Sequence, residues 1–292
     1  MRLTTIKHNK AEQACLYTPE GCIPLDSVNH TFGQKWPVDF MELLRSGRIA
    51  SLRSWYTSNI DAIRDDLKAL AIAEEKAHFA PLYRHPRKIW GIGLNYQEHA
   101  DELNETTPKG EPGSFMKPDT TIIGPDEAIQ IPLQSEKTTA EGELGIIIGK
   151  MCKDVPREDW LSVVAGFTTI IDMTAEDILR RNTRYLTLSK SFDTFFSFGP
   201  VLVTPDEIDD VMKLNVATVI NGHVHARNVV SNMNFRPDFL VSFHSKVMTL
   251  LPGDIISTGT PGAVYIQDGD IVECRIDGFA PLMNPVVDLK VQ

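Results

Sequence analysis

The chain has 292 residues, a length that predicts about two domains or one large domain with an appendage. Its composition, with 42% hydrophobic and 23% charged residues, is that of an ordinary globular protein and disfavours disordered, collagen-like and coiled-coil chains. The 29 basic and 39 acidic residues give a net charge of −10, so we expect neither nucleic acid nor an anionic membrane as a partner.

The four cysteines form no CxxC pair, which disfavours a zinc knuckle or a thioredoxin-like motif and favours free thiols in a reducing compartment. The first 15 residues lack the continuous apolar run of a secretory signal. No segment approaches the roughly 18 apolar residues of a membrane span. We therefore expect a cytoplasmic protein, with an organelle as the open alternative.

Residues 1–80 are predicted to form a small N-terminal domain of short strands up to Val28 followed by two helices. Asp39 is expected to begin the first helix, at 40–44. The second helix, from residue 58 or 59 to 76, carries apolar residues at three- and four-residue spacings that give it one packing face. Two prolines in the segment 80–86 predict a linker.

Residues 81–292 are predicted to form a β-rich domain, because short apolar runs alternate there with glycine and proline. The fold class is therefore mixed α/β. The pair Asn221-Gly222 predicts a type I′ hairpin turn. Helical stretches are expected at 157–164 and 175–184, with a weak turn at 205–211. The expected strands are 89–94, 121–123, 144–148, 167–171, 201–204, 214–220, 255–257 and 271–276.

Two glutamates, Glu141 and Glu143, lie at the start of the apolar run 144–148. Alternate residues of a strand face the same side, so both carboxylates are expected to project together at the mouth of a buried strand. Two like charges so placed repel each other unless a cation or a proton intervenes. The alternative is a solvated strand end.

A third carboxylate, Asp172, ends the run 167–171 at a predicted strand-to-helix corner, where Thr174 is expected to cap the helix and Asp177 to complete a capping box. Three carboxylates without histidine or cysteine favour Mg²⁺ or Mn²⁺ over Zn²⁺. Ordinary helix-entry chemistry is the alternative for Asp172.

Two lysines and one histidine are candidates for charge stabilisation and for general-base catalysis. Lys117 and Lys190 are flanked by aromatic residues, glycine or proline, and a lysine directed into a site could stabilise a substrate carboxylate or an enolate. His99 precedes Glu102 by three residues, a helical spacing at which the carboxylate could orient a general base. Surface lysines and an exposed ion pair are the alternatives.

Other motifs argue against a dinucleotide-binding protein, a zinc site on the hairpin and a hydrolase with a serine nucleophile elbow. Gly91-Ile92-Gly93 lacks the third glycine of a dinucleotide-binding fingerprint, because Tyr96 occupies that position. His223 and His225 follow the hairpin turn without a nearby third ligand, which favours an exposed hairpin over zinc. There is no G-x-S-x-G nucleophile elbow.

Seven segments in order, covering about two thirds of the chain from Lys88 onward, carry a resemblance to a known family. They are GIGLNYQEHADE (91–102), FMKPDTTIIGP (115–125), AEGELGIIIGK (140–150), IDMTAED (171–177), KSFDTFFSFGP (190–200), INGHVHARN (220–228) and LLPGDIISTGTPG (250–262). The sequence resembles the fumarylacetoacetate hydrolase family, in its acylpyruvate hydrolase and 2-hydroxyhepta-2,4-diene-1,7-dioate isomerase-like branch.

The resemblance implies a rolled mixed β-sheet catalytic domain, a homodimer, and a 2-oxo acid or acylpyruvate substrate. It also implies roles for individual residues. Mg²⁺ or Mn²⁺ would be held by Glu141, Glu143 and Asp172. Lys190 and Lys117 would face the substrate, Thr260 would grip its carboxylate, and Tyr96 would contribute to substrate binding. His99 and Glu102 would form a dyad on a lid over the bound substrate, with His99 activating water or shuttling a proton.

The chain departs from the family pattern at Glu176 and Leu179, where many members carry arginine and glutamine. This change argues against a second substrate carboxylate there, unless Arg180, Arg181 or Arg184 compensates. Tyr265 would narrow the site if it pointed inward.

Taken together, these features predict a Mg²⁺- or Mn²⁺-dependent hydrolase that cleaves a C–C bond in an acylpyruvate or related 2-oxo acid. Decarboxylation or keto–enol isomerisation at the same site, and a non-catalytic member with a drifted site, are the alternatives.

Overall fold

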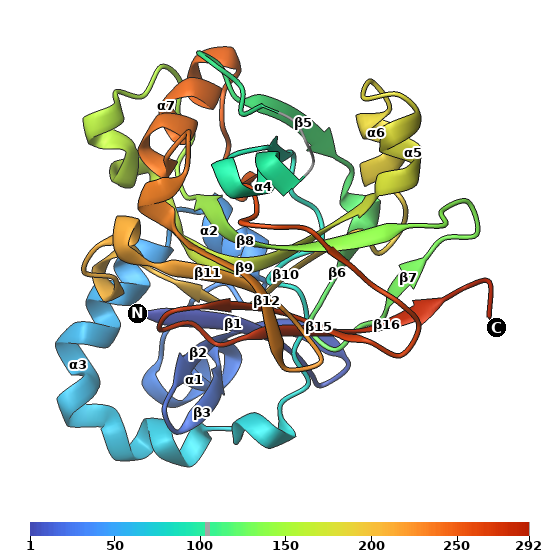
Figure 1. Cartoon of the computed structure of the whole chain (residues 1–292). Helices are drawn as coiled ribbons and strands as arrows, with labels where there is room; N and C mark the ends of the chain where they lie inside the picture. The colour runs from blue at the N-terminus through green and yellow to red at the C-terminus, as the bar shows by residue number, and fades with distance from the viewer. Residues whose placement is uncertain (103–105, 292) are drawn as a thin grey trace.

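The computed structural model describes residues 1–102 and 106–291, and the side chains of all of these except Glu102. Figure 1 shows a β-rich molecule with helices around the sheets. Within the described residues, no helix combines the length and the apolar character needed to cross a membrane.

The larger sheet has 11 strands, in the order β3-β2-β1-β10-β9-β8-β13-β4-β5, with β14 paired to β8 and β6 paired to β10. It is mixed, because β4 runs parallel to β13 and β6 parallel to β10, whereas its other pairs are antiparallel. Its strands are β1 (Arg2–His8), β2 (Ala11–Thr18), β3 (Gly21–Pro24), β4 (Ile89–Gly93), β5 (Gly113–Lys117), β6 (Ile122–Ile123), β8 (Thr138–Ile148), β9 (Val164–Ala175), β10 (Phe196–Val203), β13 (Ile255–Ser257) and β14 (Val264–Tyr265).

The second sheet has five strands, in the order β12-β11-β15-β16-β7. They are β7 (Ile129–Ile131), β11 (Asn215–Ile220), β12 (His223–Val229), β15 (Ile271–Ile276) and β16 (Leu282–Asp288). Asn221 and Gly222 join β11 to β12 with φ angles of 52° and 78°, so the predicted hairpin is confirmed.

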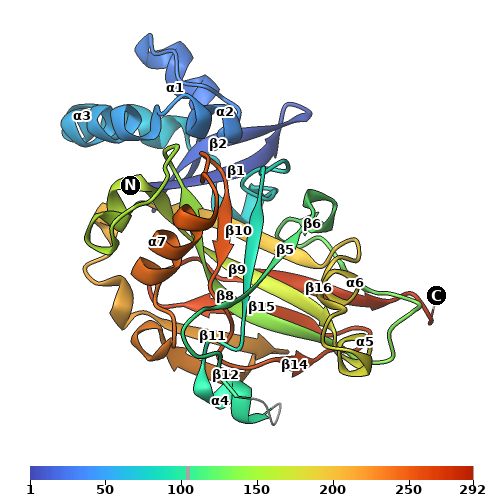
Figure 2. The same ribbon diagram turned by 90° about the horizontal axis from the view of Figure 1, so that it is seen from above.

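Helices pack around the two sheets (Figure 1). They are α1 (Leu25–Phe32), α2 (Phe40–Arg45), α3 (Ile49–Leu70), α4 (Gln97–Glu102), α5 (Glu176–Arg181), α6 (Leu186–Lys190) and α7 (Pro237–Val247). Short 3₁₀ segments are Glu74–Lys76, Asp119–Thr121, Arg157–Val163, Pro205–Glu207, Val211–Lys213 and Val230–Asn232. Figure 2 shows α5 and α6 side by side at one end of β8 and β9.

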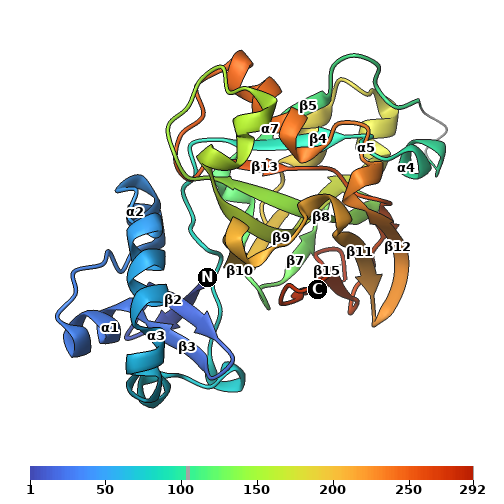
Figure 3. The same cartoon turned by 90° about the vertical axis from the view of Figure 1, so that its left-hand side faces the viewer.

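The N-terminal residues form a lobe of three helices and three strands, seen at the lower left of Figure 3. Strand β1 pairs antiparallel with β10, so the strands of this lobe extend the larger sheet. The domain boundary near residue 80 therefore stays a prediction. Asp39 caps α2 as expected, accepting a hydrogen bond from the Glu42 amide at 2.7 Å.

The bounds predicted for the next helix were wrong, because α3 begins at Ile49 and ends at Leu70 instead of covering 58–76. The fold class itself is confirmed as mixed α/β and β-rich, with two sheets containing parallel and antiparallel pairs.

The two central strands, β8 and β9, are buried along their whole length. Gly142 on β8 faces the second sheet, where an added Cβ would lie 2.9 Å from the Ala217 carbonyl oxygen. Its amide donates a hydrogen bond to Thr218 Oγ1 at 2.9 Å. The absence of a side chain at Gly142 therefore lets the second sheet approach β8, and the neighbours Glu141 and Glu143 are directed to the opposite face by the strand alternation.

Candidate active site

The three candidate metal ligands lie on one face of the β8–β9 pair. Glu141 is directly opposite Asp172 in the antiparallel register, and Glu143 is two residues further along β8. The predicted position at the mouth of a strand was wrong, because β8 begins at Thr138 and both glutamates lie inside it. Strand pairing thus brings together carboxylates that are about 30 residues apart in the chain.

The three carboxylates offer ligand oxygens that all lie within 4.8 Å of one another, and all three residues are buried. Oxygen ligands at this spacing suit a hard divalent cation such as Mg²⁺ or Mn²⁺. Three carboxylates concentrated in a buried space also repel each other, and a bound cation would relieve that repulsion. The residues therefore fit the expected ion.

Hydroxyl and amide donors orient two of the carboxylates. Thr174 donates from Oγ1 to Glu141 Oε1 at 2.7 Å. Glu143 Oε2 accepts from Ser257 Oγ at 2.5 Å and from the Gly259 amide at 2.8 Å. Donors of this kind fix the direction in which the remaining lone pairs point, as outer partners of metal ligands commonly do.

This arrangement corrects the predicted capping box. Thr174 is not a helix cap, because β9 continues to Ala175 and α5 begins at Glu176. Asp177 instead accepts a hydrogen bond from Ser135 Oγ at 2.7 Å. The sequence alternation of β9 places Thr174 on the face of Asp172, which is how its hydroxyl reaches Glu141.

Both predicted lysines reach the carboxylates. Lys190, at the end of α6, donates from Nζ to Glu141 Oε2 and to Asp172 Oδ2, each at 2.9 Å. Lys117, at the end of β5, lies 2.7 Å from Asp172 Oδ1 and also donates to the Lys190 main-chain carbonyl. The Lys190 ammonium lies 5.0 Å from the centre of the Phe115 ring. The surface-lysine alternative is therefore wrong for both residues.

The protonation of these groups follows from burial and from their neighbours. Burial, together with the charges of Asp172 and Glu141, raises the pKa of Glu143 to about 8. Burial also acts to raise the pKa of Asp172, but Lys117 and Lys190 outweigh it and the pKa is lowered. Burial lowers the pKa of Lys117. For Lys190, the charges of Asp172 and Glu141 outweigh burial and raise the pKa.

Three other residues that the sequence assigned to the site are also buried. Tyr96 is fully buried, its hydroxyl has no hydrogen-bond partner among the described residues, and burial and the Glu143 charge raise its pKa. His99, on α4, is 6% exposed. Thr260 is buried, and its hydroxyl donates to the Gly262 carbonyl at 3.0 Å. Glu102 ends α4, but its side chain lies outside the described residues, so the dyad with His99 stays a prediction.

Comparison with known proteins identifies the family. The family model for the fumarylacetoacetate (FAA) hydrolase C-terminal region matches residues 88–287. The chain belongs to the fumarylacetoacetate hydrolase family.

Relatives within this family carry several activities. Human mitochondrial oxaloacetate tautomerase FAHD2A is 37% identical over 222 residues, covering 73% of this chain and 70% of that protein. The crystal structure of 5-carboxymethyl-2-hydroxymuconate delta-isomerase from Mycobacterium smegmatis is similar over 99% of both chains, with a TM-score of 0.75 and 31% identity. Maleylpyruvate hydrolase from Sphingobium sp. SYK-6, solved with a manganese(II) ion and pyruvate, covers 99% of both chains with a TM-score of 0.79 and 28% identity.

The structure also accounts for the departures from the fumarylacetoacetate hydrolase pattern. Glu176 is buried and forms ion pairs with Arg180 and, at 2.9 Å, with Lys137. Its negative charge is thus compensated by two cations, Arg180 on α5 and Lys137 directly before β8. Tyr265 is 46% exposed on β14, so it is not enclosed in the site. Leu179 lies on α5 without a polar role.

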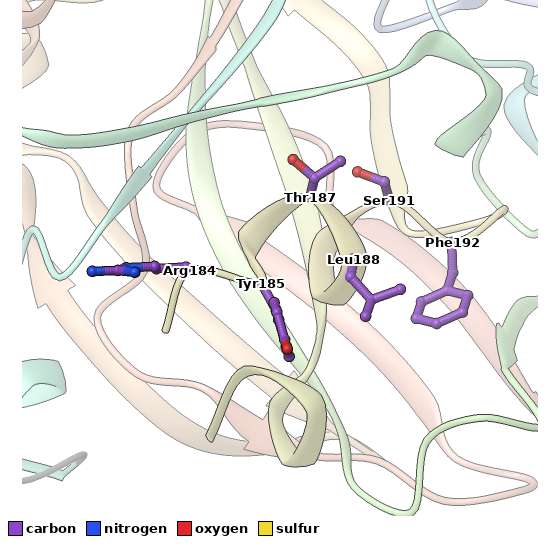
Figure 4. A pocket seen from close by; sticks show the side chains of 6 residues that line it. All are labelled: Arg184, Tyr185, Thr187, Leu188, Ser191 and Phe192. Atoms are coloured by element: carbon purple, nitrogen blue, oxygen red, sulfur yellow. The ribbon is translucent and has the colours of Figure 1, made fainter. Parts of the chain in front are cut away.

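A pocket of about 480 Å³ opens beside α6, the helix that ends with Lys190. Figure 4 shows Tyr185, Leu188 and Phe192 pointing to one side of this pocket. Its lining residues are Arg184, Tyr185, Thr187, Leu188, Ser191 and Phe192. None of them is a predicted catalytic or metal-binding residue, although Arg184 is one of the arginines that the sequence offered as compensation for Glu176.

Sequence reasoning did not predict the three donors that orient the glutamates. Thr174 was predicted only as a helix cap, and Ser257 and Gly259 were given no role. Ser257 and Gly259 belong to the segment LLPGDIISTGTPG, which the resemblance marked only for Thr260. Ser257 is the last residue of the expected strand 255–257 and Gly259 lies two residues beyond it, so the available signal was their place at the end of a buried strand.

Proposed function

We propose that this protein is a Mg²⁺- or Mn²⁺-dependent enzyme that uses water to cleave a C–C bond in an acylpyruvate or a related 2-oxo acid. The observation that carries the proposal is the buried cluster of Glu141, Glu143 and Asp172 with Lys117 and Lys190 against it. The names of the hydrolase, isomerase and tautomerase relatives support an enzyme that handles 2-oxo acids or their enols.

A divalent ion held by the three carboxylates would polarise the keto group of the substrate and favour its enolate form. The chain's own residues supply the rest. Lys117 and Lys190 place two ammonium groups at the carboxylates, where they would stabilise negative charge that develops on the substrate. Tyr96, whose buried hydroxyl has no hydrogen-bond partner in the described part of the chain, would donate a hydrogen bond to the substrate.

His99 is the proposed general base and would take a proton from the attacking water at an imidazole nitrogen. The water oxygen bonds to the acyl carbon, and the C–C bond breaks with its electron pair moving into the enolate of the 2-oxo acid. The proton is then returned to the enolate carbon. One water is consumed, and the products are a carboxylic acid and a 2-oxo acid.

The test is a panel of acylpyruvates assayed after exhaustive chelation and after the return of Mg²⁺ or Mn²⁺. Loss of the enol absorbance, with the acid and the 2-oxo acid appearing in equal amounts, is the expected result with metal. Full turnover by the chelated enzyme would refute the metal dependence. Glu143→Gln serves as the matched variant with a defective site.

A second candidate is keto–enol tautomerisation of a 2-oxo acid such as oxaloacetate, favoured by the 37% identity to human oxaloacetate tautomerase. Tautomerisation needs proton transfer but no attacking water. An enzyme that speeds the decay of enol-oxaloacetate, without splitting any acylpyruvate, would support this candidate over the hydrolase. Release of CO₂ from oxaloacetate in the same assay would identify decarboxylation, a third reaction that passes through an enolate.

We further propose that the protein is a cytoplasmic homodimer. Light scattering of the purified protein would test the oligomer, because a dimer has twice the 32.6 kDa mass of one chain.

A further inference from the structure

Asn95 is a fully buried amide between β4 and α4 whose side chain joins three parts of the chain. Its Nδ2 donates to the Thr258 carbonyl at 2.7 Å and to the Phe235 carbonyl at 2.9 Å. Its Oδ1 accepts from the Phe235 amide at 2.7 Å. Every one of these partners is a main-chain group more than 100 residues away in sequence, so the side chain holds distant loops in one arrangement.

One of these loops donates a hydrogen bond to a candidate metal ligand on β8. Thr258 is followed by Gly259, whose amide donates to Glu143 Oε2 at 2.8 Å. Gly259 has a φ of +93°, and an added Cβ would lie 2.8 Å from Asn95 Cβ. The turn therefore packs directly on Asn95, and the direction of the Gly259 amide depends on the hydrogen bond that Asn95 gives to Thr258.

Asn95 also sets the entry to the helix that carries His99. It lies two residues before the start of α4, and the preceding residue, Leu94, has a φ of +53°. A left-handed conformation at a residue other than glycine is costly and persists only where the surrounding contacts impose it. The Asn95 carbonyl accepts from the Asn234 amide at 2.8 Å, which adds a main-chain contact to the same anchor.

We propose that Asn95 is a positioning residue that fixes helix α4, with His99, relative to the carboxylate of Glu143 through the Thr258–Gly259 turn. The inference rests on the proposed function, because it assigns the two ends of the coupling to the general base and to a metal ligand. An amide is required at this position, because it donates two hydrogen bonds and accepts one, whereas a carboxylate can only accept. An aspartate at residue 95 would direct negative charge at the carbonyls of Thr258 and Phe235.

The chain contains a matched control in Asn284 of β16, which is also fully buried. Its Nδ2 donates to the carbonyls of Gly124 and Glu127, both at 2.8 Å. Asn284→Asp therefore removes two amide donors from two main-chain acceptors in the same way as Asn95→Asp. The hydrogen bonds of Asn284 involve neither the carboxylate cluster nor α4.

The experiment compares Asn95→Asp, Asn284→Asp and wild type by thermal unfolding, by Mn²⁺ titration calorimetry well below the unfolding temperature, and by kcat. Both variants are expected to unfold at lower temperature. Only Asn95→Asp is expected to weaken Mn²⁺ binding by about tenfold or more and to lower kcat, in the range seen when partners of metal ligands are changed. Asn95→Ser, which keeps one donor, gives a milder variant if the aspartate variant does not fold.

Wild-type Mn²⁺ affinity in folded Asn95→Asp, or an equal loss of affinity in Asn284→Asp, would overturn the inference. Hydrogen exchange of the metal-free proteins provides a second readout that does not depend on the ion. Asn95→Asp should increase exchange in α4 and in the 257–260 turn together, and exchange that rises in neither would overturn the coupling. If wild type itself binds no Mn²⁺, the proposed function fails, and the exchange measurement still decides the role of Asn95.

Discussion

Replacing Lys190 by methionine should have three effects that differ in direction. Methionine keeps a long unbranched side chain but removes the ammonium that donates to Glu141 and Asp172, both at 2.9 Å. Lys117, 2.7 Å from Asp172, is then the only one of the two lysines left to balance the negative charge of the carboxylates. The metal-free protein should therefore lose stability.

The magnitude follows from the geometry. Opposite charges 2.9 Å apart attract by about 6 kcal/mol at an effective dielectric constant of about 20, and the desolvation of the buried groups offsets a large part of this attraction. Removing one partner of a buried ion pair costs about 3–5 kcal/mol in measured cases. For a chain of this size, such a cost lowers the unfolding temperature by on the order of 10 °C.

Mn²⁺ should bind more tightly to Lys190→Met than to wild type, because the ion and the ammonium compete for the same carboxylate oxygens. Saturating Mn²⁺ should also restore most of the lost stability, since it supplies the missing positive charge. Turnover should nevertheless fall, because the substrate loses a cation that stabilises its developing charge. Calorimetric unfolding with and without Mn²⁺, together with Mn²⁺ titration, measures these effects.

Lys88→Met is the matched control, because Lys88 lies 2.6 Å from Asp254, which is fully buried, in a second ion pair that does not involve the carboxylate cluster. It should lose stability without any rescue by Mn²⁺. Equal rescue of both variants, or a metal-free Lys190→Met protein as stable as wild type, would refute the reasoning.

Three further predictions test other parts of the molecule. Glu143→Gln should weaken Mn²⁺ binding by more than about tenfold without lowering the stability of the metal-free protein, because burial already disfavours the charged carboxylate; calorimetry measures both quantities. His99→Ala should lower kcat on a hydrolysed substrate by about 10²–10⁴ and leave Mn²⁺ affinity nearly unchanged, and a wild-type rate would remove His99 from the mechanism. Burial acts against ionisation of Asp206, but hydrogen bonds from Thr204 and Arg53 outweigh it and lower its pKa to about 2. Its stabilising contribution should therefore be present above about pH 4 and disappear as the pH falls to about 2. Urea unfolding of Asp206→Asn should show a deficit below about 1 kcal/mol at pH 7 and none near pH 2, because the ion pair is partly exposed.

The sequence contained enough information to place two of the three candidate metal ligands relative to each other. The alternation of a strand places Glu141 and Glu143 on one face whatever the partner strand is, and Gly142 between them marks a close approach from the other face. The position of Asp172 opposite Glu141 depends on the register of β8 and β9, which local patterns do not specify. The sequence could therefore suggest that the three carboxylates share a cation, but it could not show that Asp172 lies opposite Glu141.

The bounds predicted for β8 and for the end of β9 failed because polar residues are buried there. The apolar run 144–148 marks less than half of β8, because the first half of the strand, 138–143, also contains threonine, glutamate and glycine, and it includes both candidate ligands. The same substitution of polar for apolar residues made Thr174 look like a helix cap. A pattern that relies on apolar side chains stops where a buried strand carries polar side chains.

The donors from Ser257, Gly259 and Asn95 could not be predicted for a different reason. Each is a contact between segments far apart in sequence, and a main-chain amide such as that of Gly259 has no residue-type signal at all. Serine and asparagine near a strand end more often form local turns than partners of a distant carboxylate.

The buried carboxylates can persist without a bound ion because the cluster can reach electrical balance with its own lysines. With its pKa raised to about 8, Glu143 holds its proton at neutral pH, and the two remaining carboxylates, Glu141 and Asp172, are matched by Lys117 and Lys190. Binding of a divalent ion must then displace a proton from Glu143 and draw the carboxylates away from Lys190. The lysines that would stabilise an enolate should therefore also stabilise the metal-free protein, and this double role is why the Lys190→Met variant separates stability, affinity and turnover.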